Sequence, residues 1–208
     1  MALKSPAGRP ELAYNAQAPK IWYTTRSMSP PTILIPGQPT PPKSVPIYTA
    51  RGNAIPNCQS DELTGLNWKD IRQLYKDNTN NATVHFLAES CARYNCHGLT
   101  FGSRRAEIDG ENSTISMILN EDCFVALKTS EPVQPGDIAI YYDEDGDIQH
   151  SGIVAEIRVS TFGAPVPFVW SKWGKGPEVV HSANSGEYNS CSIVFYRKRR
   201  CTNCRCHI

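Results

Sequence analysis

The chain has 208 residues, which is enough for one sizeable core or for one domain with an extension. Its 21 basic and 20 acidic residues give a net charge of +1, so charge offers no argument for binding nucleic acid or an anionic membrane. No apolar stretch is long enough for a transmembrane helix, so we expect no membrane span.

The N-terminal part of the chain is rich in proline. Eleven of the sixteen prolines fall at or before Pro56, and they disfavour helices and central strands. We therefore expect an extended arm or linker over residues 1–55, a folded domain over 56–200 and a Cys-rich tail over 201–208. An alternative for the arm is a ligand for a proline-reading module or an export signal.

The chain start also bears on localisation. Residues 1–12 carry Lys4 and Arg9 but no apolar run follows, so we expect no secretory signal peptide. This predicts cytoplasmic synthesis, with any secretion depending on a specialised export machinery.

The first half of the domain is predicted to be helical. The apolar spacing indicates helices near residues 66–74 and over 84–94. A further helix is expected from Cys96 toward Ala106, and another from Ser113 or Thr114 through Leu119.

The pattern changes at Gly136, from which strands are expected. Alternating and β-branched residues predict strands over 137–142, 148–159, 166–171, 178–182 and 191–197. The turn at residues 143–146 has strong hairpin chemistry. Helices followed by an antiparallel sheet predict an α+β fold with N-terminal helices packed on a C-terminal sheet.

The chain has eight cysteines, and we expect them to be reduced because the chain is long and has a normal apolar fraction. Four ligand-type residues crowd the tail, where zinc is an alternative to an unstructured end: Cys201, Cys204, Cys206 and His207. Since structural zinc sites usually use two separated ligand pairs, we expect no metal and no cofactor.

Cys96 is the candidate nucleophile. A cysteine at a helix start lies near backbone N–H groups that favour the thiolate and can receive an oxyanion. A lone cysteine is more often a packing residue, so Cys96 needs a partner base.

His150 is the candidate base. It begins the apolar run Ser151-Gly152-Ile153-Val154, so its imidazole would sit at the start of a strand. A neutral imidazole there could deprotonate Cys96 and then protonate the leaving group. The alternative is a histidine that only ends a hairpin.

Three segments together resemble the papain-like cysteine hydrolases of the NlpC-like and CHAP amidase-peptidase type. They are Asn95-Cys96-His97-Gly98, Pro135-Gly136-Asp137-Ile138-Ala139 and the strand from His150 to Val154. The resemblance covers about residues 85–197 and implies a papain-like fold with a Cys-His-polar triad. The family's usual Asp-Cys-Ser-Gly is Asn-Cys-His-Gly in this chain.

The third triad member is expected after the His150 strand. His181 ends the next predicted strand and is our choice to orient His150, with Asn184 as the alternative. Candidate substrate contacts are Asn95, His97, Gly98 and Trp173, although paired tryptophans in a β-rich region are more often core and rim.

The resemblance implies an enzyme that cleaves an amide bond in a peptide, protein or peptidoglycan substrate. The same dyad also serves deamidases and acyltransferases. With the proline-rich arm, a bacterial toxin or effector with an immunity partner is a further interpretation. The alternative from another class is a binding module without turnover, or a metal-dependent interaction protein built on the Cys-rich tail.

Overall fold

The structure is a computed structural model that describes residues 43–59, 73, 84–185, 188 and 190–200. The chain divides into two units, Met1–Thr40 and Pro41–Ile208, and all described residues belong to the second. Most of the proline-rich arm, nearly all of the helix predicted near residues 66–74 and the Cys-rich tail lie outside the described residues.

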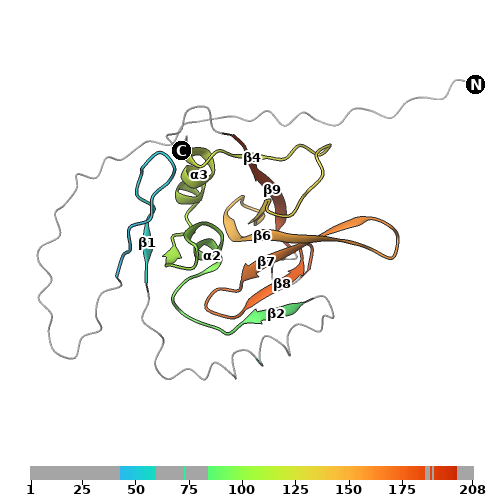
Figure 1. The fold of residues 1–208 in the computed structure, drawn as a ribbon, viewed down its shortest axis with the longest axis horizontal. Coiled ribbons are helices and arrows are strands. Elements are labelled where there is room, and N and C mark those ends of the chain that lie inside the picture. The colour runs from blue at the N-terminus through green and yellow to red at the C-terminus, as the bar shows by residue number, and fades with distance from the viewer. Residues whose placement is uncertain (1–42, 60–72, 74–83, 186–187, 189, 201–208) are drawn as a thin grey trace, which may run out of the picture. The chain divides into compact units, whose positions relative to one another are not determined.

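The fold is α+β and rich in sheet, and the predicted fold class is confirmed at this level. Seven strands form one antiparallel sheet in the order β2-β8-β7-β6-β5-β9-β4 (Figure 1). Their bounds, in sheet order, are His85–Ala88, Glu178–Ser182, Pro165–Lys172, Ile148–Val159, Ile138–Tyr142, Ser192–Lys198 and Phe124–Ala126.

Two helices and a small second sheet complete the described part. Helix α2 spans Cys96–Gly102 and α3 spans Asn112–Glu121. Strands β1 (Asn57–Cys58) and β3 (Glu107–Ile108) pair antiparallel. Helix α2 contacts β6 and β7, and α3 contacts β4.

The predictions for the C-terminal strands are confirmed closely. The strands predicted over 148–159 and 178–182 have those bounds in the structure. In the β5–β6 turn, the Asp143 carboxylate accepts backbone N–H bonds from Asp145 and Asp147 at 3.1 and 2.8 Å. Gly146 takes a φ of 84°, which glycine adopts without the Cβ clash of other residues. Strand β4 was not predicted.

The helix predicted over residues 84–94 is wrong. This segment forms strand β2, in which His85 pairs with Val180 and Phe86 with Val179. Val84, His85 and Phe86 are β-branched or aromatic, and the open edge of β8 offers them backbone partners. Leu87, which helical spacing would bury, is 57% exposed.

Helix α2 is shorter than predicted. It ends at Gly102 because Ser103 and Arg104 have left-handed φ values of 50° and 62°. The following segment crosses back against the helix, so a Cβ on Gly98 would lie 1.9 Å from the Ala106 carbonyl oxygen. A glycine is required there by the close approach of two backbones. Helix α3 covers its predicted segment and extends it at both ends.

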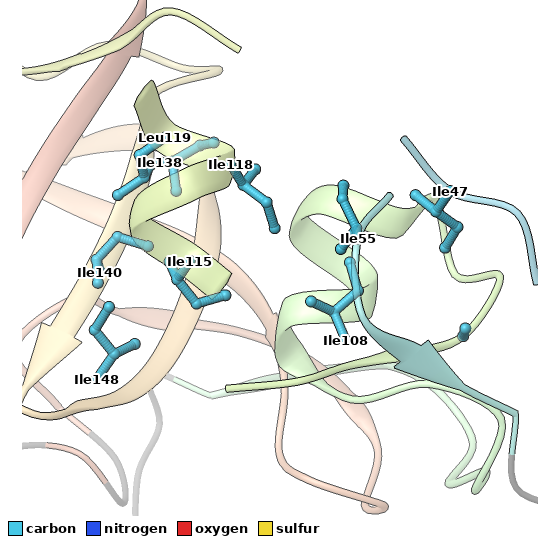
Figure 2. Close-up of a cluster of buried hydrophobic side chains, with 10 residues drawn as sticks. Ile47, Ile55, Ile108, Ile115, Ile118, Leu119, Ile138, Ile140 and Ile148 are labelled. Atoms are coloured by element: carbon cyan, nitrogen blue, oxygen red, sulfur yellow. The ribbon is translucent and has the colours of Figure 1, made fainter. Parts of the chain in front are cut away.

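Two apolar clusters use alternate residues of β5, as the period of two along a strand requires. Ile138 and Ile140 join the cluster that includes Ile115 and Leu119 of α3 (Figure 2). The same cluster continues to Ile47, Ile55 and Ile108, which gather around α2. Ala139 and Tyr141 join a second cluster with Val154, Val169 and Ala183.

Candidate functional site

The first residue of α2 is Cys96, and its place is fixed by Asn95. The Asn95 Oδ1 accepts the backbone N–H groups of Gly98 at 2.8 Å and Ile108 at 3.2 Å, while Nδ2 donates to the Ile108 carbonyl at 2.8 Å. Asn95 therefore caps the helix and ties it to β3. Its amide, which we expected to contact substrate, is engaged within the protein.

Cys96 lies against strand β6. Its side chain is 6% exposed, and burial raises the pKa of the thiol to about 11. Backbone hydrogen bonds from Ser151 and His97 and the charge of Lys172 act in the opposite direction on this pKa. Ser151 directly follows His150 in β6, so the two side chains point to opposite faces of the sheet: the Ser151 hydroxyl contacts α2, and the His150 ring packs on Tyr141 and Tyr188.

His97 packs into β6 beside Cys96. Thr100 donates its hydroxyl to the Cys96 carbonyl at 2.9 Å, and Ser151 donates to Thr100 at 3.0 Å. Consequently the His97 Nδ1 donates to the Ser151 hydroxyl at 2.9 Å. Burial lowers the pKa of His97 to about 4, so the ring is neutral at physiological pH.

His150 is fully buried, and neither of its ring nitrogens has a hydrogen-bond partner among the described residues. Its ring stacks on Tyr188, with centroids 4.0 Å apart and planes inclined by 9°, and it lies 5.2 Å from the Tyr141 ring. Burial, with smaller contributions from His181 and His97, lowers the pKa of His150 well below its ordinary value. The ring is therefore held by packing and remains neutral.

His181 lies on β8, separated from β6 by β7. Its ring centroid is 6.5 Å from that of His150, and no hydrogen bond joins the two rings in the described structure. The Nδ1 of His181 donates to the carbonyls of Ser182 and Ser185 at 2.9 and 3.0 Å, so Nε2 accepts from the Ser171 hydroxyl at 3.0 Å. Burial lowers the pKa of His181.

The remaining predicted site residues lie at different depths. Trp173 is fully buried, and its ring is 5.8 Å from the His181 ring, so it supports the histidines from within the core. Gly98 faces the Ala106 carbonyl. Asn184, the alternative to His181, is exposed after the end of β8.

Sequence reasoning missed the polar residues that support these rings. Ser151 bonds His97, Ser171 bonds His181, and Tyr188 stacks on His150. Ser151 and Ser171 both lie in predicted strands. A serine in a strand, however, has no sequence feature that shows whether its hydroxyl will bond a histidine ring. Tyr188 lies in a turn that no motif marks.

A pocket of about 520 Å³ borders the start of α2. It is lined by Asn95 and by residues of the paired strands β1 and β3, and its acidic side chains are Glu107 and Asp109. Gly110 also lines the pocket, and a Cβ on it would lie 3.1 Å from the His97 Nε2. His97 thus connects the wall of the pocket with Ser151 of β6.

Most of the described cysteines are free. Cys58, Cys91, Cys96 and Cys191 are thiols, whereas Cys123 is disulfide-bonded, which corrects the expectation of a reduced cysteine at that position. In the described part of the chain, no group of three or more His, Cys, Asp or Glu side chains is placed to hold a metal ion. The tail ligands Cys201, Cys204, Cys206 and His207 lie outside that part.

Within the segments that the structure describes, no helix has the length and apolarity needed to cross a membrane. No family model matches the chain, and comparisons with curated proteins and with solved structures give no match either.

Proposed function

We propose that the chain is a cysteine hydrolase that cleaves an amide bond with Cys96 as nucleophile and His150 as base. One observation carries this proposal. The first turn of α2 is bonded to β6 through the His97 ring and the Ser151 hydroxyl, and His150, which precedes Ser151 in β6, is fully buried with no partner for either ring nitrogen in the described residues. A buried polar group without a partner costs about 1–3 kcal/mol, and a group that must exchange protons is one reason to keep it.

The pair rests in its neutral form. Burial raises the thiol pKa and lowers the imidazole pKa, so both electrostatic effects oppose a preformed thiolate–imidazolium pair. Turnover therefore requires water and substrate to reach Cys96 and His150. Their polar atoms would then lower the energetic cost of forming the charged thiolate and imidazolium. We assign the described arrangement to the resting enzyme.

In the proposed reaction, Cys96 attacks the amide carbonyl while His150 takes the thiol proton. The C–N bond then breaks as His150 returns that proton to the leaving amine. Water next attacks the thioester and gives one proton to His150, the C–S bond breaks, and His150 returns that proton to the Cys96 sulfur, while the carboxylic acid loses its own proton to solvent. His181 acts as a positioning residue, since Ser171 and two backbone carbonyls fix its ring 6.5 Å from His150.

The arrangement of elements supports a papain-like, NlpC-like fold for the domain. Cys96 begins a helix that contacts β6 and β7, and His150 lies in the strand that follows the β5–β6 turn. This order agrees with the resemblance noted in the sequence. We propose peptide, protein or peptidoglycan amides as substrates, with deamidation and acyl transfer as variants, and a toxin or effector role with an immunity partner.

A binding module is the second candidate. The 6% exposure of Cys96 and its raised thiol pKa favour this candidate, because an inert buried thiol has the same properties. The pocket beside Asn95 would then be its binding site.

The Cys96→Ala variant separates the two candidates. We expect it to lose all digestion of purified peptidoglycan or protein substrate, and all growth inhibition on expression in the bacterial cytoplasm or periplasm. Thermal unfolding should remain cooperative, because alanine preserves the backbone at the start of α2. The matched control is Cys191→Ala, which alters a half-buried free thiol and should keep wild-type activity.

Retention of activity by Cys96→Ala would contradict the mechanism. Absence of activity in all of these assays, for the wild type as well as for Cys96→Ala, would favour the binding module.

A further inference from the structure

Cys123 lies at the corner between α3 and β4. Its backbone carbonyl accepts the Arg199 N–H at 2.8 Å, and its own N–H donates to the Asn120 carbonyl at 3.3 Å. The side chain is half-buried and is disulfide-bonded. The corner therefore holds this cysteine in place through its backbone, and the sulfur joins it covalently to a second cysteine.

The partner of Cys123 follows from the inventory of cysteines. The chain has eight cysteines, and four of those other than Cys123 are free thiols, namely Cys58, Cys91, Cys96 and Cys191. The three that remain all belong to the Cys-rich tail, outside the described residues: Cys201, Cys204 and Cys206. Elimination therefore directs the Cys123 disulfide to the tail.

The course of β9 brings the tail to the same corner. Phe124 of β4 pairs with Lys198 of β9, and the hydrogen bond from Arg199 to Cys123 continues this ladder by one residue. Cys201 follows Arg199 by two residues, which span at most about 7 Å of extended chain. Disulfide-bonded Cα atoms usually lie about 4–7 Å apart. The tail thus leaves the sheet within disulfide reach of Cys123.

We infer that Cys123 is bonded to one of the three tail cysteines, and that this disulfide is a redox-controlled anchor for the C-terminal tail. The inference does not depend on the proposed hydrolase function. In an oxidising compartment the bond closes and holds the tail at the α3–β4 corner. In a reducing cytoplasm it opens, and the tail is released as a group of free thiols.

Closure of the anchor removes two electrons from the protein, and a small disulfide such as glutathione disulfide accepts them. One protein thiolate attacks this disulfide, which forms a mixed disulfide and releases one glutathione. The second protein thiolate then attacks the protein sulfur of the mixed disulfide and releases the other glutathione. The two thiol protons pass through solvent to the two departing glutathione thiolates.

The anchor also limits what the tail can bind. Zinc is ligated by cysteine as the thiolate, so a sulfur in a disulfide is lost as a ligand. The closed anchor therefore leaves the tail at most three of its four ligand-type side chains, which are Cys201, Cys204, Cys206 and His207. A four-ligand zinc site and the closed anchor exclude each other.

The test maps the disulfides of wild-type protein equilibrated with glutathione disulfide. The protein is unfolded in iodoacetamide without reductant, digested with trypsin and analysed by mass spectrometry. Trypsin cuts after Lys and Arg, so Cys123 falls in the peptide 106–128 and the tail in the peptides 201–205 and 206–208. We expect peptide 106–128 to be linked to one of these two tail peptides. Prior treatment with dithiothreitol should remove the link and leave Cys123 alkylated.

An alkylated Cys123 in the oxidised protein would overturn the inference. A link from Cys123 to Cys58, Cys91, Cys96 or Cys191 would overturn it equally.

A second measurement tests whether the disulfide restrains the chain. The wild-type urea midpoint should fall by about 1–2 M on reduction, because an open disulfide no longer restricts the unfolded state. Cys123→Ser should have the same midpoint with and without reductant. The matched control Cys191→Ser alters a free thiol and should keep the wild-type response. An unchanged wild-type midpoint would overturn the anchoring role, and this comparison decides even if Cys123→Ser does not fold.

Discussion

At the scale of single residues, Asn95 does more for the site than its place beside the nucleophile suggests. One amide caps α2 and makes two backbone hydrogen bonds with Ile108 of β3. The start of α2, and with it the position of Cys96, therefore depends on a side chain that a sequence motif would assign to substrate.

We expect Asn95→Ala to reduce the free energy of unfolding by about 2–4 kcal/mol, from the lost cap and the lost bonds to β3. Asn95→Asp should cost less, because a carboxylate still accepts both N–H groups and loses only the donation to the Ile108 carbonyl. Urea unfolding of the three proteins measures both effects. Equal stability of Asn95→Ala and the wild type would show that the amide is not needed for the fold.

At the scale of secondary-structure elements, the sequence predicts strands well and the N-terminal part of the domain poorly. Strands β6 and β8 have their predicted bounds because alternation and turn chemistry are local signals. The segment from Val84 has helical spacing, yet it becomes β2 because the edge of β8 supplies backbone partners that a local pattern does not contain. Tertiary pairing therefore decides this element.

The same distinction holds for the candidate site. Cys96 at a helix start and His150 in a strand follow from local patterns. The hydrogen bonds of His181 with Ser171, and the burial of Lys172 beside the α2 segment, follow from strand order and loop packing. These contacts join residues that are far apart in the chain or lie in loops, so no periodic pattern in a single sequence predicts them.

At the scale of the whole molecule, three buried histidines make stability depend on pH. Burial is the main cause that lowers the pKa values of His97, His150 and His181 below 6.5 in the folded state. In the unfolded chain these rings gain protons as the pH falls through about 6.5. The unfolded state then binds more protons than the folded state, so stability is lost on acidification.

We expect the free energy of unfolding to be highest above about pH 6.5 and to fall as the pH approaches about 4, by about 1.4 kcal/mol per pH unit for each histidine that stays neutral. Urea unfolding across this range measures the slope. His97→Gln, which can still donate to Ser151, should reduce the slope. A flat profile in the wild type would contradict the assignment of neutral buried rings.

The most direct test of the central claim compares Cys96 alkylation in wild-type protein and His150→Gln at neutral pH. Glutamine has a similar volume but cannot take the thiol proton, so the account predicts a rate at least about tenfold lower in His150→Gln. His85→Gln should alkylate at the wild-type rate, and thermal unfolding confirms that each variant is folded. Identical alkylation rates in folded wild-type and His150→Gln protein would show that the thiol and the imidazole do not act together.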